Sequence, residues 1–175
     1  MRVVAGELKG RRLASPPRRA ADVRPTSDRA RETLFALLGD VSGARVLDLY
    51  AGTGALAIEA LSRGAADAVL VDSDPRVARR NVSGLGLEDR CEVVRSDALR
   101  YLAGSDETFD LVLCDPPYAL GAKLGPDLGR LVPPRLDAGG RLVVESSSRA
   151  PVDLDLSLVA ERRIGEALIR IWTAR

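Results

Sequence analysis

Histidine is absent from this sequence of 175 residues, and cysteine is scarce. The two cysteines, Cys91 and Cys114, lie far apart, and neither has a second cysteine at the spacing of a metal-binding pair. Zinc sites and histidine-based catalytic triads depend on these residue types. We therefore expect neither kind of site, and no bound metal.

Long apolar runs are lacking as well. No segment approaches the roughly 20 apolar residues of a membrane-spanning helix, and the basic start of the chain has no apolar stretch typical of a signal peptide. We expect a cytoplasmic protein that does not enter a membrane, which agrees with the low cysteine content. The hydrophobic content of 46% suits one globular domain of ordinary size.

Lysine is rare, with two residues against 24 arginines, and positive charge is concentrated at the start of the chain. Residues 1–31 hold nine Lys or Arg against three Asp or Glu, a sum of +6, so the remainder carries −5 within a net charge of +1. A basic arm on a mildly acidic body indicates a polyanionic partner, although a solubilising tail would have the same composition. The residues expected to contact phosphates are Arg2, Lys9, Arg11 and Arg12.

Apolar segments and amphipathic segments alternate over most of the chain, which predicts strands and helices in turn. Strands are predicted at residues 46–50, 68–71, 91–95, 109–114 and 141–145, and helices after Pro25 and at 55–63, 74 onward, 97–102 and 125–136. Strands that are apolar on both faces favour a parallel sheet covered by helices. Segments 156–163 and 167–173 predict an antiparallel hairpin. The fold class is thus α/β, with a mostly parallel sheet of seven strands.

A glycine-rich turn follows the first strand, in the segment Asp48-Leu49-Tyr50-Ala51-Gly52-Thr53-Gly54. Glycines at such a turn let a bulky ligand approach the backbone, as in dinucleotide-binding folds, and a tight turn without a ligand is the alternative. Asp48 argues against a pyrophosphate, which it would repel, and for an ammonium group. The candidate ligand-binding residues are Asp48, Tyr50, Ala51, Gly52, Thr53 and Gly54.

Two further acidic residues lie at or just after the ends of predicted strands. Asp72, followed by Ser73, closes the second strand, where an acid can bind both hydroxyls of a ribose. Asp97, followed by Ala98, comes after the third strand and is placed to accept a hydrogen bond from an adenine amine. Asp97 could equally cap the next helix. Asp74 is predicted to cap the helix that begins at Pro75.

The most informative segment is Asp115-Pro116-Pro117-Tyr118, directly after the fourth strand. The Asp115 carboxylate and a neighbouring carbonyl can accept two N–H groups, Tyr118 can stack on a flat ring, and the prolines fix the backbone. These residues together form a clamp for a planar group that carries an exocyclic amine. The alternative is a proline-stiffened turn whose acid caps a helix.

The order of these motifs resembles that of the Rossmann-like class I methyltransferases, which use S-adenosylmethionine. The opening segment, from Arg2-Val3-Val4-Ala5-Gly6 to Arg11-Arg12-Leu13, resembles the start of the RsmD family of bacterial 16S ribosomal RNA guanine-N2 methyltransferases. Arg24-Pro25-Thr26-Ser27-Asp28-Arg29 begins a second segment similar to that family, and Asp115 to Tyr118 match its catalytic block. The departures are mild, with Ala5 where the family usually has glycine.

The resemblance implies methyl transfer to guanine N2 of 16S ribosomal RNA. Because a short arm and one small domain leave little surface for reading RNA at long range, we expect the assembled small subunit rather than naked RNA as the substrate, and a monomeric enzyme. Asp115, Pro116, Pro117 and Tyr118 would be catalytic, the turn and the two acids would hold the cofactor, and Arg24, Thr26 and Arg29 would join the RNA-binding residues. We expect a basic arm or hairpin over residues 1–25 and a methyltransferase domain over residues 26–175.

Three other functions remain open from the residues. Methyltransferases of adenine N6 or glutamine N5 share the clamp, but usually carry an added recognition domain, for which 175 residues leave no room. An NAD-dependent oxidoreductase would need a general acid or base such as His or a Tyr-x-x-x-Lys pair, and neither occurs. A non-catalytic RNA-binding module is disfavoured by the intact acids Asp48, Asp72 and Asp115.

Overall fold

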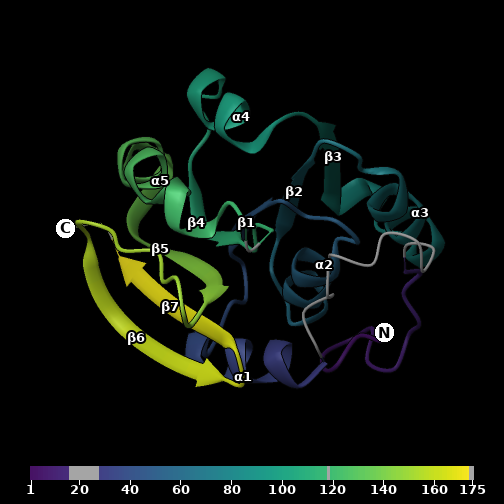
Figure 1. The fold of residues 1–175 in the computed structure, drawn as a ribbon. Helices are drawn as coiled ribbons and strands as arrows, with labels where there is room; N and C mark the ends of the chain where they lie inside the picture. Colours follow the sequence, from purple (N-terminus) through teal and green to yellow (C-terminus); the bar gives the residue numbers. More distant parts are fainter. Residues whose placement is uncertain (16–27, 118, 174–175) are drawn as a thin grey trace.

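A computed structural model describes residues 1–15, 28–117 and 119–173. Its centre is a sheet of seven strands in the order β3-β2-β1-β4-β5-β7-β6 (Figure 1). Neighbouring strands from β3 to β5 pair in parallel, and β7 pairs antiparallel with both β5 and β6. The strands are β1 Arg45–Leu49, β2 Asp67–Asp72, β3 Cys91–Arg95, β4 Phe109–Cys114, β5 Leu136–Ser147, β6 Ser157–Ile164 and β7 Ala167–Thr173. The predicted α/β class and the closing hairpin are confirmed.

Helices cover both faces of the sheet because the inner strands are apolar on both sides. They are α1 Asp28–Leu38, α2 Ala55–Ser62, α3 Arg76–Leu85, α4 Ala98–Gly104 and α5 Gly125–Leu131, with short 3-10 turns at Glu88–Arg90, Gly121–Leu124 and Pro133–Arg135. Val46 packs in the cluster under α1, α2 and α3, and its neighbour Leu47 packs in the cluster under α4 and α5. This alternation follows the two-residue period of a strand.

The N-terminal hairpin, residues 1–13, packs on α2. Its two arms meet at an antiparallel bridge between Arg2 and Arg12. Glu59 of α2 is fully buried, and its carboxylate accepts the N–H groups of Val4 and Ala5 at 2.7 and 3.0 Å. A buried carboxylate is costly unless it is hydrogen-bonded, so this contact fixes the hairpin to the helix. The basic hairpin is therefore hydrogen-bonded to α2 and packs as part of the domain.

Beyond shifts of one or two residues at other ends, three elements differ from the sequence-based expectation. Asp74 does not cap α3, whose N-cap is Pro75 without a side-chain bond; instead it pairs with Arg76. The helix expected over 125–136 ends at Leu131, because Pro133 and Pro134 lie in a 3-10 turn. The strand expected at 141–145 is β5, which has 12 residues. The division at residue 25 falls outside the described residues.

The packing of the hairpin can be tested with two glycines of similar backbone. Gly6 and Gly10 have φ of +81° and +83°, so alanine is strained at both. A Cβ at Gly6 would lie 1.7 Å from the Ser62 carbonyl oxygen, whereas one at Gly10 would meet nothing within 4 Å. We expect Gly6→Ala to lower the free energy of unfolding by at least about 1 kcal/mol more than Gly10→Ala in urea titrations. Equal losses would contradict the observed packing.

Candidate functional site

The register of three parallel strands brings the predicted acids to one edge of the sheet. Leu49, the last residue of β1, pairs with Val71 of β2 and with Cys114 of β4. The next residues along these strands are Tyr50, Asp72 and Asp115. Asp72 in turn pairs with Arg95, two residues before Asp97. The carboxyl ends of parallel strands are the usual ligand site of such sheets.

The glycine turn between β1 and α2 is a tight, left-handed segment. Tyr50 has φ of 60°, a conformation that a non-glycine residue rarely adopts, and Gly52 and Gly54 also have positive φ. A Cβ at Gly54 would lie 2.7 Å from a methyl of Leu70. The N–H of Gly52 donates to the Asp72 carboxylate at 2.8 Å. Glycines thus allow the tight conformation of the turn, and a hydrogen bond connects the turn to Asp72 of the neighbouring strand.

Asp48 is a buried carboxyl with an unusual protonation equilibrium. Its side chain is 2% exposed and accepts one hydrogen bond, from the N–H of Ala57 at 3.1 Å. Burial, reinforced by the negative charges of Asp115 and Asp72, raises the pKa of Asp48 to about 8. The negative charges of Asp115 and Asp72 disfavour the ionised form of Asp48, so this edge of the sheet favours a cationic ligand.

Asp72 and Asp97 differ in how their oxygens are used. Both Asp72 oxygens accept backbone N–H groups, from Gly52 and from Asp74, and each oxygen keeps a further lone pair for a ligand. Ser73, beside it, is exposed. Asp97 caps α4 by accepting the N–H of Arg100 at 2.9 Å, one of its two predicted roles. A bond from Asp97 to an adenine, and a role for the buried Ala98, stay predictions.

The clamp segment lies at the end of β4. Asp115 is partly exposed, Pro116 is buried, and Pro117 is exposed with its carbonyl accepting the N–H of Leu120 at 2.8 Å. Tyr118 lies outside the described residues. Asp115 is close enough to Asp48 and to the buried Cys114 to raise the pKa of both groups. The acid of the clamp therefore belongs to the same negative site as the glycine turn.

A buried amide that sequence reasoning missed connects this site to the N-terminal hairpin. Asn81 of α3 is 4% exposed and accepts the N–H of Ala14 at 2.7 Å. Its Nδ2 donates to the carbonyls of Ala14 and of Thr53, at 3.2 and 2.8 Å. One side chain thus holds both the end of the hairpin and the glycine turn. A lone asparagine in an amphipathic helix gives no sequence signal for such a role.

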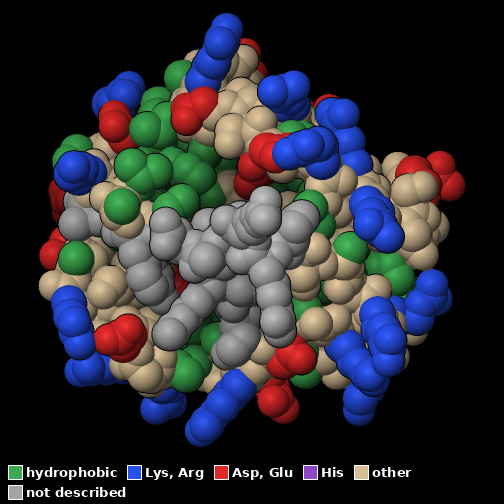
Figure 2. Space-filling view, turned by 45° about the vertical axis from the view of Figure 1, so that its right-hand side comes forward, with side chains coloured by type: hydrophobic (Ala, Val, Ile, Leu, Met, Phe, Trp, Pro, Cys, Tyr) green, Lys and Arg blue, Asp and Glu red, His purple; other side chains and the backbone are tan. Residues whose placement is uncertain are grey.

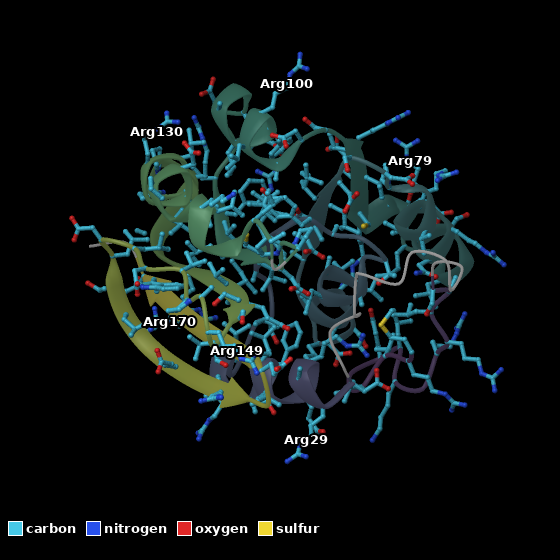
Figure 3. All side chains as sticks on the ribbon, viewed as in Figure 1. Arg29, Arg79, Arg100, Arg130, Arg149 and Arg170 are labelled. Atoms are coloured by element: carbon cyan, nitrogen blue, oxygen red, sulfur yellow. The ribbon has the colours of Figure 1, made fainter. Side chains whose placement is uncertain are left out.

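The predicted RNA-binding residues are placed at the surface where the structure describes them. Arg2, Lys9, Arg11 and Arg12 of the N-terminal hairpin are all exposed. Arg29 is exposed on α1 and points away from the body (Figure 3). Arg24 and Thr26 lie outside the described residues. The hairpin thus presents a group of cations to solvent on the side of α2 that faces away from the sheet.

The described ranges contain neither a membrane span nor a metal cluster. In residues 1–15, 28–117 and 119–173, no helix has the length and apolar character needed to cross a bilayer. The same residues include no group of three or more His, Cys, Asp or Glu side chains that could hold a metal ion.

Known proteins resemble this chain in sequence and in structure. The model of the family described as "Conserved hypothetical protein 95" matches residues 1–173. Ribosomal RNA small subunit methyltransferase D of Escherichia coli K12 is 40% identical over 124 residues, which are 69% of this chain and 62% of that protein. The match thus spans less than two thirds of that relative's length.

The fold has relatives among solved structures. A hypothetical protein of Thermus thermophilus superposes with a TM-score of 0.84 and 31% identity, over 99% of both chains. An RNA methyltransferase of Salinibacter ruber in complex with S-adenosyl-L-homocysteine has a TM-score of 0.65 and 22% identity, over 86% of this chain and 93% of that one. These likenesses confirm the predicted Rossmann-like methyltransferase fold.

The raised pKa of Asp48 predicts how stability depends on pH. The unfolded chain releases this proton near pH 4 and the folded chain near pH 8, so between these values the folded state binds more protons and stability falls as pH rises. Asp48→Asn removes the titration. We expect the variant to gain at least about 1 kcal/mol relative to the wild type between pH 5 and pH 8 in urea titrations. The exposed Asp89→Asn is the control, and parallel profiles for Asp48→Asn and wild type would contradict the assignment.

Proposed function

The chain belongs to the RsmD family, and from this we propose that it is an S-adenosylmethionine-dependent methyltransferase of ribosomal RNA. Its acceptor is the exocyclic N2 amine of a guanine in 16S ribosomal RNA, in the small subunit or an assembly intermediate of it. It acts in the cytoplasm, as a monomer and without a metal. The observation that carries the proposal is the gathering of Asp48, Asp72 and Asp115 around a glycine turn.

The residues of this edge suit S-adenosylmethionine better than a dinucleotide. The cofactor carries an ammonium, a sulfonium and one carboxylate but no phosphate, so its net charge is positive and the negative site attracts it. Asp48 would bind the ammonium group and Asp72 the ribose hydroxyls. Asp97 and Ala98 would contact the adenine, and the backbone of the turn from Tyr50 to Gly54 would lie against the cofactor. A pyrophosphate beside the same three carboxylates would be repelled, which disfavours NAD.

The clamp residues would act on the acceptor amine. S-adenosylmethionine, when bound, supplies an electrophilic methyl group on its sulfonium. Asp115 and the Pro116 carbonyl accept the two N–H groups of guanine N2, orient its lone pair and stabilise the positive charge that develops on nitrogen. Asp115 need not remove a proton first, because a neutral aryl amine is a very weak acid; the proton leaves after the new bond forms. Tyr118 stacks on the unstacked base.

The N-terminal hairpin would bind the RNA backbone. Its exposed cations, with Arg24, Thr26 and Arg29, contact phosphates and position the substrate without reading its sequence. Because the hairpin is held by Glu59 and Asn81, the contacts made by its own cations would be fixed relative to the glycine turn. A small surface of this kind fits an assembled ribonucleoprotein, which supplies a rigid shape, better than naked RNA.

The catalytic role of Asp115 can be tested by methyl transfer. We expect Asp115→Ala to lower the rate at least about 100-fold, as the loss of a group that stabilises developing charge does elsewhere. Tritiated S-adenosylmethionine with small subunits from a strain that lacks the gene gives the rate, and mass spectrometry of the nucleosides identifies the product. N2-methylguanosine from the wild type supports the proposal. Absence of N2-methylguanosine would contradict the proposed reaction. Near-normal turnover by Asp115→Ala would contradict the role of Asp115.

The ribose role of Asp72 predicts a change in cofactor affinity. Asp72→Ala should weaken S-adenosylmethionine binding at least about 10-fold in calorimetry, because it removes hydrogen bonds to a charged group. Asp74→Ala is the matched control, since that carboxylate is two residues away and pairs with Arg76. Unchanged affinity in Asp72→Ala, or an equal loss in Asp74→Ala, would refute the assignment.

A further inference from the structure

A hollow of about 350 Å³ lies beside the cofactor edge of the sheet, between the start of α3 and the end of β3. It is separate from the carboxylate site, although Asp72 and Arg95 are paired residues of adjacent strands. The residues that line it are Asp74, Pro75, Arg76, Arg79 and Arg95. Three guanidinium groups and one carboxylate thus share one small concavity.

The positive charge of this hollow is only partly neutralised. Arg76 forms a two-pronged pair with Asp74, at 2.7 and 2.6 Å. Arg79 and Arg95 each donate a single bond of 3.3 Å to a backbone carbonyl, of Val93 and of Ser73. The charge of Arg95 contributes to the lowered pKa of Asp74, after the larger effect of Arg76. One carboxylate faces three cations, so the hollow has an excess of positive charge.

Several other arginines of the described residues have acidic partners. Arg63 pairs with Glu59, Arg90 with Glu7, and Arg170 with Glu161 and Asp153. Among the ion pairs found in the described ranges, none includes Arg79 or Arg95. Figure 3 shows Arg79 pointing outward from α3, and Figure 2 shows Lys and Arg side chains gathered along the right of the face. These donors are available to an external anion.

We propose that the hollow of Arg76, Arg79 and Arg95 binds a phosphate of the RNA chain whose guanine is held at Asp115. The inference rests on the proposed function and adds a second backbone contact to that of the N-terminal hairpin. Arginine suits this ligand because its planar fork donates two bonds to one phosphate. The anionic group of S-adenosylmethionine is its carboxylate, which shares a carbon with the ammonium proposed to bind at Asp48 of β1. In that binding mode the carboxylate lies away from β3, so the cofactor does not account for the site.

The position of the hollow fits an RNA strand that passes over the cofactor edge. From β4, which carries the clamp, to β3 there are three strand spacings, or roughly 14 Å, a distance that a few nucleotides cover. The N-terminal hairpin lies on the other side of α3, where Asn81 bonds Ala14. A strand could therefore be held at the hairpin, across α3 and at the hollow while one base enters the clamp.

The test compares two charge-matched double variants at opposite edges of the sheet. Arg79→Gln with Arg95→Gln alters the hollow at β3, and Arg162→Gln with Arg163→Gln alters exposed arginines of β6. Arg163 is a close match, because it also donates to a backbone carbonyl, that of Gly165. Binding of small subunits, and of a fluorescent single-stranded RNA of about 20 nucleotides, is measured over a range of KCl concentrations, and S-adenosylmethionine affinity by calorimetry.

The hollow variant should bind RNA about 3- to 10-fold more weakly, with a salt slope reduced by about 0.7 to 1. Its cofactor affinity should be unchanged, and the β6 variant should behave like the wild type. An unaltered slope in the hollow variant, or equal losses in both variants, would overturn the inference while leaving the proposed function intact. A wild type that neither binds nor methylates the RNA would overturn both.

Discussion

The parallel register of β1 with β2 and β4 determines the chemistry of this protein. It places Asp48, Asp72 and Asp115 close together at one edge, where burial and mutual repulsion raise the pKa of Asp48. Such an arrangement costs folding free energy in the absence of a ligand. In the proposed function, a bound cation would relieve the repulsion, and the same charges would favour a positively charged cofactor over a phosphorylated one.

The second constraint is the attachment of the N-terminal hairpin to the body. Glu59 and Ser62 of α2 bond its backbone at one end, and Asn81 of α3 bonds Ala14 at the other. Because Asn81 also holds the Thr53 carbonyl, the basic surface and the glycine turn share one support. In the proposed function, RNA contacts and cofactor contacts would therefore be set at a fixed separation by side chains that touch neither ligand.

Sequence reasoning identified the features that depend on local pattern. The strands at Cys91–Arg95 and Phe109–Cys114 were predicted to the residue, because each holds β-branched or aromatic residues between polar segments. The cap predicted at Asp74 was wrong because Arg76, two residues on, pairs with its carboxylate. The roles of Asn81 and the buried Glu59 could not be recognised from the sequence. Asn81 bonds Ala14, 67 residues away, and Glu59 bonds Val4 and Ala5, 55 and 54 residues away, so only the packed fold brings these groups together. The pKa of Asp48 likewise depends on neighbours from other strands.

The buried bond between Glu59 and the hairpin backbone limits how modular this protein can be. The carboxylate has no contact with water, and its bonds to Val4 and Ala5 replace hydration that it lost on folding. A version cut back to the sheet and its helices would take both backbone donors away from that carboxylate and leave Arg63 as its remaining partner. A hairpin grafted from another protein would likewise need an α2 surface that presents this carboxylate, so the basic arm and its supporting helix form one structural unit.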